Sequence, residues 1–321
     1  YLWAVTPTQT RLVPLPSRNV IAATVNRYRS ALLGPDDVLA SSNADGAALY
    51  RMLVAPAADL IRPGAKVVVV SDGALSRLNF ETLLVPSPHP HYWIEDATLV
   101  SAPSLHMLAS TKPFADADPK MLLLGNAQSP DPDYPELPNA QVEMSEIEKH
   151  FAPKDQTILA QTQANPAAYL TSNPQQYAYI HFVAHGTASL TDPLDSAIIL
   201  SRDSAPDNSF KLYAREIIQH PLHARLVTIS SCYGGGTRSY AGEGLVGLSW
   251  AFLRAGAHNV IGALWEVSDD STPALMNALY QGLQQGLSPN VALRQAKLAM
   301  LHSKNFRSPF FWAPFQLYTG L

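Results

Sequence analysis

The sequence predicts an α/β fold in which helices flank a mostly parallel β-sheet. Short runs rich in β-branched and apolar residues alternate along the chain with longer helical patterns, as in proteins built from βαβ units. Apolar residues make up 47% of the 321 residues, which is enough for a large buried core. Two predicted strands also end in residues with reactive side chains, and such residues collect beyond the carboxyl ends of parallel strands.

Residues 1–115 are predicted to form a subdomain of their own. Its predicted elements are, in chain order, a strand Tyr1–Val5, a helix Asn19–Leu33, a helix Ala47–Ile61, a strand Lys66–Val70 and a strand Ile94–Val100. The segment Lys112–Lys120 contains two prolines and is typical of a linker. We expect this subdomain to dock on the rest of the chain by extending or flanking its sheet.

Residues 116–321 are predicted to form a second, larger subdomain. Its predicted strands are Met121–Leu124, Ala178–Ala184, Ala197–Leu200, Arg225–Ser231 and Asn259–Leu264, and its predicted helices are Asn139–Phe151, Leu245–Arg254, Thr272–Gln284 and Asn290–His302. A long, proline-rich loop, Gly125–Pro138, joins the first of these strands to the first helix. Loops of that length often carry function.

The composition of the chain excludes several classes of function. Charged residues make up only 15% and the net charge is −4, so neither nucleic acid nor an anionic membrane is expected as a partner. No apolar run reaches membrane-spanning length, and the first residues do not lead us to expect a signal peptide. The single cysteine excludes internal disulfides and cysteine-cluster metal sites, so we expect a cytoplasmic protein with no metal or cofactor. Because the chain opens with Tyr1, we expect a fragment or a processed form.

The two strand ends that carry reactive side chains are those before His185 and Cys232. The first strand runs into His185 and Gly186, and the second runs into Cys232, with glycines close behind it. A thiol has an unperturbed pKa of about 8.5, and a neighbouring imidazole can take its proton and later return it to a leaving amine. Glycine N–H groups at such turns can hold an oxyanion. This chemistry requires the two strands to be neighbours.

Two other interpretations compete with this one. His181 and His185 lie about 13 Å apart along an extended strand, too far to bind one zinc ion, so His181 is expected to face the core. The run Gly242–Gly247 matches a dinucleotide fingerprint, with Glu266 near the position of the ribose-binding acid. Its first glycine follows the preceding strand too distantly for that motif. These glycines would otherwise let a helix pack tightly against the sheet.

Several segments resemble the CHAT domain, a caspase-like module often found after tetratricopeptide repeats. They are IHFVAHG, ISSCYGG, AGEGLVGLSWAFLRAGAHNVIGALWEVSDDST, LRQAKLAML and SPFFWAPFQLYTG, and, nearer the N-terminus, YLWAVTPT, LVPLPSR, VVVVSDGALSRLNFETL and IEDATLVSAPS. The resemblance covers nearly the whole chain. The segment ALWEVSDD is also similar, more distantly, to separase.

The resemblance implies a caspase-like fold and thiol peptidase activity. His185 would be the general base, Cys232 the nucleophile, and the backbone N–H groups of Gly186 and Cys232 the oxyanion hole. The first subdomain would be a caspase-like half without a catalytic dyad. The implied partners are a protein substrate and an upstream tetratricopeptide-repeat or sensor module that controls the enzyme. The alternative is a catalytically silent scaffold of the same fold.

Specificity is expected to come from the strand that follows the nucleophile. That strand should lie beside the Cys232 strand, because successive elements usually pack together. Trp265 could then form an apolar wall, and Glu266 or Asp269 could place a carboxylate at the pocket floor. A partly desolvated carboxylate binds a guanidinium bidentately, so arginine, then lysine, is expected before the cut. The further candidates for this carboxylate are Asp131, Asp133 and Asp195, and the alternative for Asp269 and Asp270 is to cap the helix that follows.

Overall fold

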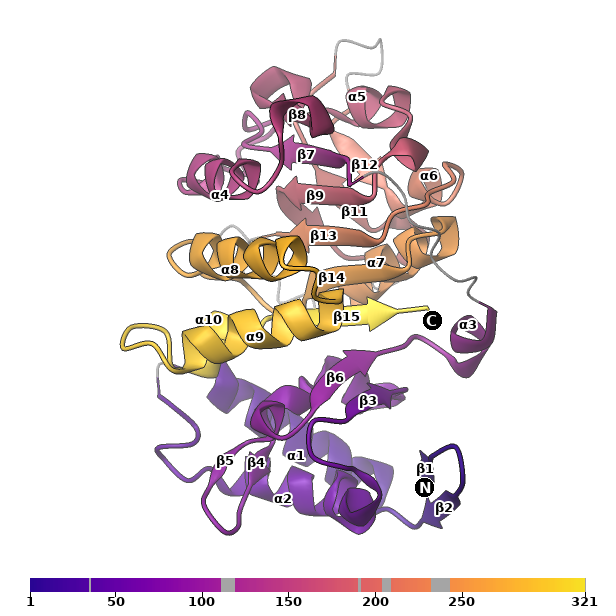
Figure 1. The fold of residues 1–321 in the computed structure, drawn as a ribbon, viewed down its shortest axis with the longest axis vertical. Coiled ribbons are helices and arrows are strands. Elements are labelled where there is room, and N and C mark those ends of the chain that lie inside the picture. The colour runs from indigo at the N-terminus through magenta and orange to yellow at the C-terminus, as the bar shows by residue number, and fades with distance from the viewer. Residues whose placement is uncertain (35, 111–118, 190–191, 204–208, 232–242, 321) are drawn as a thin grey trace.

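The computed structural model of the chain describes residues 1–34, 36–110, 119–189, 192–203, 209–231 and 243–320. Within them, the largest sheet has eight strands in the order β3-β6-β15-β14-β13-β9-β7-β8 (Figure 1). In that order the strands are Lys66–Val69, Thr98–Ser101, Phe315–Thr319, Asn259–Ala263, Leu226–Ser230, Tyr179–Val183, Met121–Gly125 and Gln156–Ala160.

The sheet consists of two blocks of parallel strands that run in opposite directions. Strands β14, β13, β9, β7 and β8 are parallel to one another, and so are β3, β6 and β15. The blocks meet where β14 pairs antiparallel with β15. The sheet is therefore mostly parallel, as predicted. Strands β8 and β15 are not among the predicted strands.

Three smaller sheets accompany the large one. One consists of β10 (His185–Thr187), β11 (Ala197–Ile199) and β12 (Lys211–Tyr213), all antiparallel. Strand β11 was predicted, but it belongs to this small sheet. The other two are the hairpins β1–β2 (Leu2–Val5 and Thr10–Val13) and β4–β5 (Leu84–Val85 and His91–Tyr92).

Helices cover both faces of the large sheet (Figure 1). In chain order they are α1 Arg18–Leu32, α2 Ala44–Leu53, α3 Leu105–Ser110, α4 Ala140–Glu148, α5 Pro166–Thr171, α6 Ala214–Ile217, α7 Glu243–Ala255, α8 Thr272–Gln284, α9 Pro289–Leu301 and α10 Pro309–Trp312. Among these described helices, none combines the length and the apolar character that a membrane span would need.

Two neighbouring residues of β9 show which helix covers which face. His181 contacts Glu143 of α4 and Tyr280 of α8, whereas the Phe182 ring lies 5.6 Å from the Phe252 ring of α7. Successive side chains of a strand point to opposite faces of its sheet. Helices α4 and α8 therefore share one face, and α7 covers the other.

The N-terminal part departs from the prediction at two elements. The predicted helix Ala47–Ile61 is divided into α2 and a 3-10 turn, Ala55–Leu60, because Pro56 has no N–H to continue an α-helix. The predicted strand Ile94–Val100 is a 3-10 turn, Trp93–Glu95, followed by β6. The segment 111–118, with the predicted boundary at residue 115, lies outside the described residues.

The N-terminal part extends the sheet of the C-terminal part, as expected. Strands β3 and β6 add to it at β15. The buried Lys297 of α9 forms an ion pair with Glu81 and donates to the Phe315 carbonyl of β15 at 2.6 Å. Arg294, one turn earlier on α9, donates to the Ile94 carbonyl at 2.8 Å. Hydrogen bonds and an ion pair therefore join the two parts beside the shared sheet.

Candidate active site

The strands that precede His185 and Cys232 are neighbours in the sheet. Strands β9 and β13 pair in parallel, and the last pair in register is Val183 with Ser230. A Cβ atom added to Gly186 would lie 3.4 Å from the Ser231 side-chain oxygen, so the chains remain close beyond the strands. The adjacency that a Cys–His dyad requires is therefore present. Cys232, the next residue in the chain, lies outside the described residues.

The His185 imidazole is buried and held by a backbone carbonyl. Only 7% of the residue is exposed, and Nε2 lies 2.7 Å from the Pro135 carbonyl oxygen. A carbonyl oxygen only accepts hydrogen bonds, so Nε2 carries the proton of this bond. In the neutral imidazole, Nδ1 then holds the lone pair and is the basic nitrogen. A main-chain oxygen therefore orients the imidazole at Nε2.

The proline-rich loop between β7 and α4 supplies this carbonyl. It also brings the Tyr134 ring to 6.1 Å from the His185 ring, between centroids, and to 6.2 Å from the Phe210 ring. Arg202 donates to the Pro130 carbonyl at 2.8 Å and stands over the Phe210 ring. The predicted functional loop is therefore packed against His185 and tied to the segment that precedes β12.

Asp131 and Asp133 shape this loop. An Asp131 carboxylate oxygen accepts from the Asp133 backbone N–H at 3.0 Å, which is an Asx turn. The Asp131 carbonyl accepts from Tyr134 N at 2.9 Å. The Asp133 side chain is exposed. A role in turn geometry accounts for Asp131, while Asp133 stays a candidate on the outer side of the loop.

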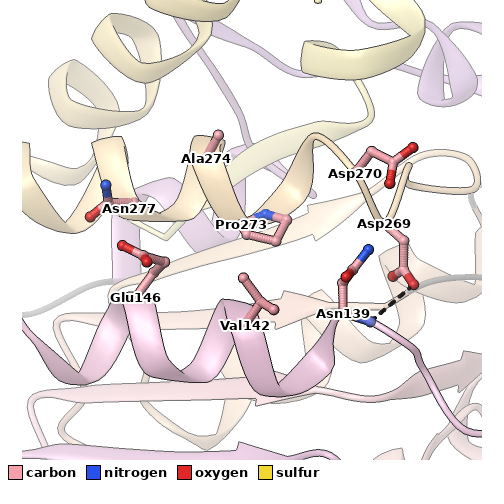
Figure 2. A pocket seen from close by; sticks show the side chains of 8 residues that line it. All are labelled: Asn139, Val142, Glu146, Asp269, Asp270, Pro273, Ala274 and Asn277. Carbon is pink, nitrogen blue, oxygen red and sulfur yellow. Dashed lines mark hydrogen bonds between the residues drawn. The ribbon is translucent and has the colours of Figure 1, made fainter.

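Asp269 lies in a pocket between the beginnings of α4 and α8 (Figure 2). The pocket has a volume of about 420 Å³, and its lining residues, here called the acidic pocket, are Asn139, Val142, Glu146, Asp269, Asp270, Pro273, Ala274 and Asn277. Three of the eight are carboxylates and none is a cation. Asp269 Oδ2 accepts from the Asn139 backbone N–H at 3.4 Å. Asp269 therefore contacts the start of α4, and among the described residues Ser271 holds the N-cap position of α8.

The other predicted specificity residues lie elsewhere. Strand β14 neighbours β13 as predicted, but Trp265 beyond its end is 95% buried, and its Nε1 has no hydrogen-bond partner among the described residues. Glu266 is exposed, and nearby atoms that displace water raise the pKa of its carboxyl group. Asp195 forms an ion pair with Arg215, so its charge is already balanced. Neither Trp265 nor Glu266 lines the acidic pocket.

The last glycine of the predicted dinucleotide fingerprint has a steric explanation. A Cβ atom on Gly247 of α7 would lie 3.0 Å from the Pro193 carbonyl oxygen and 3.1 Å from the Ser196 hydroxyl. Gly262 of β14 similarly leaves room for the Ser249 hydroxyl of α7. Gly247 and Gly262 therefore allow α7 to pack closely, and for Gly247 this agrees with the packing explanation of the run. Gly242, the first glycine of the run, lies outside the described residues.

Two features of this region were not predicted from the sequence. The Pro135 carbonyl has no sequence signature, because every residue carries the same backbone group. His181 is fully buried, as expected, but it also binds Glu143 and Tyr280. The sequence does contain a signal for the Glu143 contact. Glu143 interrupts the apolar stripe of Ala140, Met144 and Ile147 on α4, and a carboxylate on a buried face needs a polar partner.

Residues 43–320 match the family model of the CHAT domain. The chain belongs to the CHAT-domain family. Tetratricopeptide repeat protein 28 of Mus musculus is 25% identical to it over 320 residues, which cover 84% of this chain, and the Homo sapiens protein of the same name is 23% identical. The chain spans only 13% of the length of each of these relatives.

Among solved structures, this CHAT domain is similar to separase in the Saccharomyces cerevisiae separase–securin complex. The TM-score is 0.50 with 16% sequence identity, and the match covers 78% of this chain and 15% of that one. At this identity the likeness concerns the fold. The CHAT domain is thus a mixed α/β protein with a mostly parallel sheet, as the sequence predicts, and its architecture is separase-like.

Proposed function

We propose that this CHAT domain is a cysteine endopeptidase that cleaves a protein substrate with Cys232 as nucleophile and His185 as general base. One observation carries the proposal. Strands β9 and β13 are parallel neighbours. The buried imidazole of His185, held through Nε2, follows β9, and Cys232, the single cysteine of the sequence, comes two residues after the end of β13 in the chain. Reactive residues gather at this edge in open parallel sheets.

The chemistry follows from the tautomer of His185. Nδ1 takes the proton of the Cys232 thiol, and the thiolate sulfur attacks the carbonyl carbon of the scissile peptide bond. The Gly186 and Cys232 N–H groups donate to the resulting oxyanion. Collapse of the tetrahedral intermediate breaks the C–N bond, and the leaving amine takes the proton from the imidazolium. Water, deprotonated by His185, then hydrolyses the thioester. The Pro135 carbonyl holds the imidazole in one orientation throughout.

The glycine at position 186 supports the oxyanion role. Against the described residues, a Cβ atom there would make only ordinary contacts, the nearest at 3.4 Å, and the backbone does not adopt a positive φ. Neither these neighbours nor the backbone conformation requires a glycine at this position. A glycine instead leaves the backbone N–H open to close approach by a substrate.

The proposed substrate carries a basic residue before the scissile bond. The acidic pocket offers the Asp269, Asp270 and Glu146 carboxylates to a guanidinium or ammonium group. It also lies near the base, because Pro135 and Asn139 are separated by at most about 14 Å of extended chain. Asp269, which is partly buried and contacts Asn139, is the proposed specificity residue.

Control of the peptidase is proposed to come from a partner or a repeat module. The curated relatives named above are tetratricopeptide repeat proteins far longer than this chain. Movement of the loop between β7 and α4 would shift the Pro135 carbonyl and so the orientation of His185. The chain is proposed to become active without cleavage after Cys232, and to act in the cytoplasm, where a lone thiol stays reduced.

A thiol-directed peptide inhibitor with arginine in the position before its reactive group tests this proposal. The inhibitor is expected to label Cys232 in wild type and to fail to label it in His185→Ala. Wild type is also expected to cleave peptides with arginine before the scissile bond. A folded protein that is labelled no faster than free cysteine, with or without a candidate partner, would instead be a silent module of the same fold. Activity that appears only after a cut beyond Cys232 would refute activation without cleavage.

A further inference from the structure

A buried polar cluster lies on β9, four residues before the candidate base in the sequence. His181 of β9 is fully buried, and its Nε2 donates to Glu143 Oε1 of α4 at 3.0 Å. Its Nδ1 lies 3.0 Å from the Tyr280 hydroxyl of α8. Glu143 is 4% exposed and Tyr280 1%. One imidazole thus joins a strand to two helices, and this cluster has no role in the chemistry proposed above.

Stability alone does not explain such a cluster. Replacing a buried ionic network by apolar residues of similar volume is often neutral or stabilising. What polar groups add is direction, because hydrogen bonds require a defined distance and angle whereas apolar contacts do not. The cluster is therefore suited to select one position of the elements that it joins.

Helix α4 is an element whose position needs such a constraint. It has only nine residues, and its buried apolar residues are Ala140, Met144 and Ile147. Its N-cap residue, Asn139, caps no backbone N–H with its side chain among the described residues. Apolar contacts from these three side chains alone would permit the helix to slide or rotate. The hydrogen bond from His181 to Glu143, in the first turn of α4, opposes both movements.

The beginning of α4 is also the end of the loop that orients His185. Pro135 lies five residues before Ala140, the first residue of the helix, and the Asn139 N–H between them contacts Asp269. The Pro135 carbonyl must stand at 2.7 Å from Nε2 of His185. A displacement of α4 by about 1 Å would therefore break or bend this hydrogen bond.

We propose that Glu143, His181 and Tyr280 are positioning residues of the peptidase. They hold α4 in one place, and α4 in turn holds the Pro135 carbonyl against His185. This inference rests on the proposed function, since it assigns the cluster to the orientation of the proposed base.

The decisive variant removes the cluster without leaving an unpaired polar group. In Glu143→Met/His181→Leu/Tyr280→Phe, the melting temperature is expected to stay within a few degrees of wild type. The kcat for an arginine peptide is expected to fall roughly ten- to a hundredfold, with KM changed less than about twofold. Glu143→Gln, which keeps an oxygen acceptor for His181, should retain most of the kcat. Glu148→Gln, on the same helix but outside the cluster, is the matched control.

A second measurement is independent of turnover. In the Cys232→Ala background, ¹⁵N NMR of labelled histidine is expected to show His185 protonated at Nε2, with assignment from the spectrum of His185→Gln. The apolar triple variant should show a mixture of the two tautomers. If wild type cleaves no peptide, the proposed function fails while this spectrum still tests the positioning.

Three results would overturn the inference. The first is a triple variant whose kcat and His185 tautomer equal those of wild type. The second is a kcat that falls only to the extent that the melting temperature falls, since loss of stability alone would then explain it. If the triple variant does not fold, Tyr280→Phe replaces it in both measurements. Tyr280→Phe removes one hydrogen bond of His181 and keeps the aromatic ring at position 280. If this variant has the spectrum and the kcat of wild type, the inference is overturned, which is the third result.

Discussion

The Nε2 atom of His185 lies 2.7 Å from the carbonyl oxygen of Pro135, so the candidate base is oriented by the main chain of a loop. This loop lies between β7 and α4, two elements that contact β9. The orientation of the base therefore depends on elements far from it in the sequence.

The first prediction concerns the dyad. Cys232→Ala is expected to abolish peptide cleavage, and His185→Ala to reduce it by roughly a thousandfold or more, since both residues act in one proton and acyl transfer. The double variant should be little worse than Cys232→Ala, because members of such a unit fail together. Kinetic assays of purified variants check this, with His302→Ala, an exposed histidine on another helix end, as control. Appreciable cleavage by Cys232→Ala would remove the assignment.

The second prediction concerns the ring packed on the base. Tyr134→Ala is expected to lower kcat by roughly tenfold, because His185 and the Pro135 carbonyl lose the ring beside them. Tyr134→Phe keeps the ring and should stay close to wild type. Pro135→Ala keeps the carbonyl oxygen and should also be mild. A Tyr134→Phe variant as impaired as Tyr134→Ala would point to the hydroxyl group instead.

The third prediction concerns specificity. Asp269→Asn is expected to abolish the preference for arginine before the scissile bond. The loss of a charge-assisted hydrogen bond should weaken transition-state binding of the arginine peptide by roughly 1.5–3 kcal/mol. A peptide series that varies only this residue measures the preference as kcat/KM. Asp133→Asn, on the exposed side of the loop, is the comparison. If the preference disappears in Asp133→Asn and survives in Asp269→Asn, the pocket has been assigned to the wrong carboxylate.

The fourth prediction concerns the buried ion pair between Lys297 and Glu81. Lys297→Met is expected to lower the free energy of unfolding by about 3–5 kcal/mol, because it leaves the Glu81 carboxylate buried without its partner. Lys297→Met/Glu81→Leu should recover much of this loss. Urea denaturation followed by circular dichroism measures both variants. An equal loss in the single and double variants would show that packing, and not the charge, accounts for the effect.

The fifth prediction concerns the proposed division at residue 115. A fragment of residues 116–321 is expected to be insoluble or poorly folded, since it exposes the edge of β15 that pairs with β6 and leaves Lys297 unpaired. Size-exclusion chromatography and circular dichroism, compared with residues 1–321, check this. A soluble and fully active fragment would show that the N-terminal part is dispensable.

Much of the fold follows from local patterns in the sequence. Strands β7, β9, β13 and β14 are short apolar runs, and α8 begins and ends at the residues predicted. Local patterns failed where pairing partners decide the structure. Strand β15 was not predicted, and its place between β14 and β6 comes from its pairing with both. Strand β8 has no fully buried residue, and its pairing with β7 makes it a strand.

For the candidate site, the sequence by itself determined the residue types and their places at strand ends. His185 and Cys232 are candidates because reactive groups and glycine turns follow apolar runs, and the oxyanion role of Gly186 comes from the resemblance to the CHAT domain. Only the tertiary structure decided that β9 and β13 are neighbours, that Pro135 orients the imidazole, and that Asp269 faces the start of α4. The physical reason is that strand order and backbone acceptors are non-local: a carbonyl oxygen is the same in every residue, and its partner is chosen by the packing of elements distant in the chain.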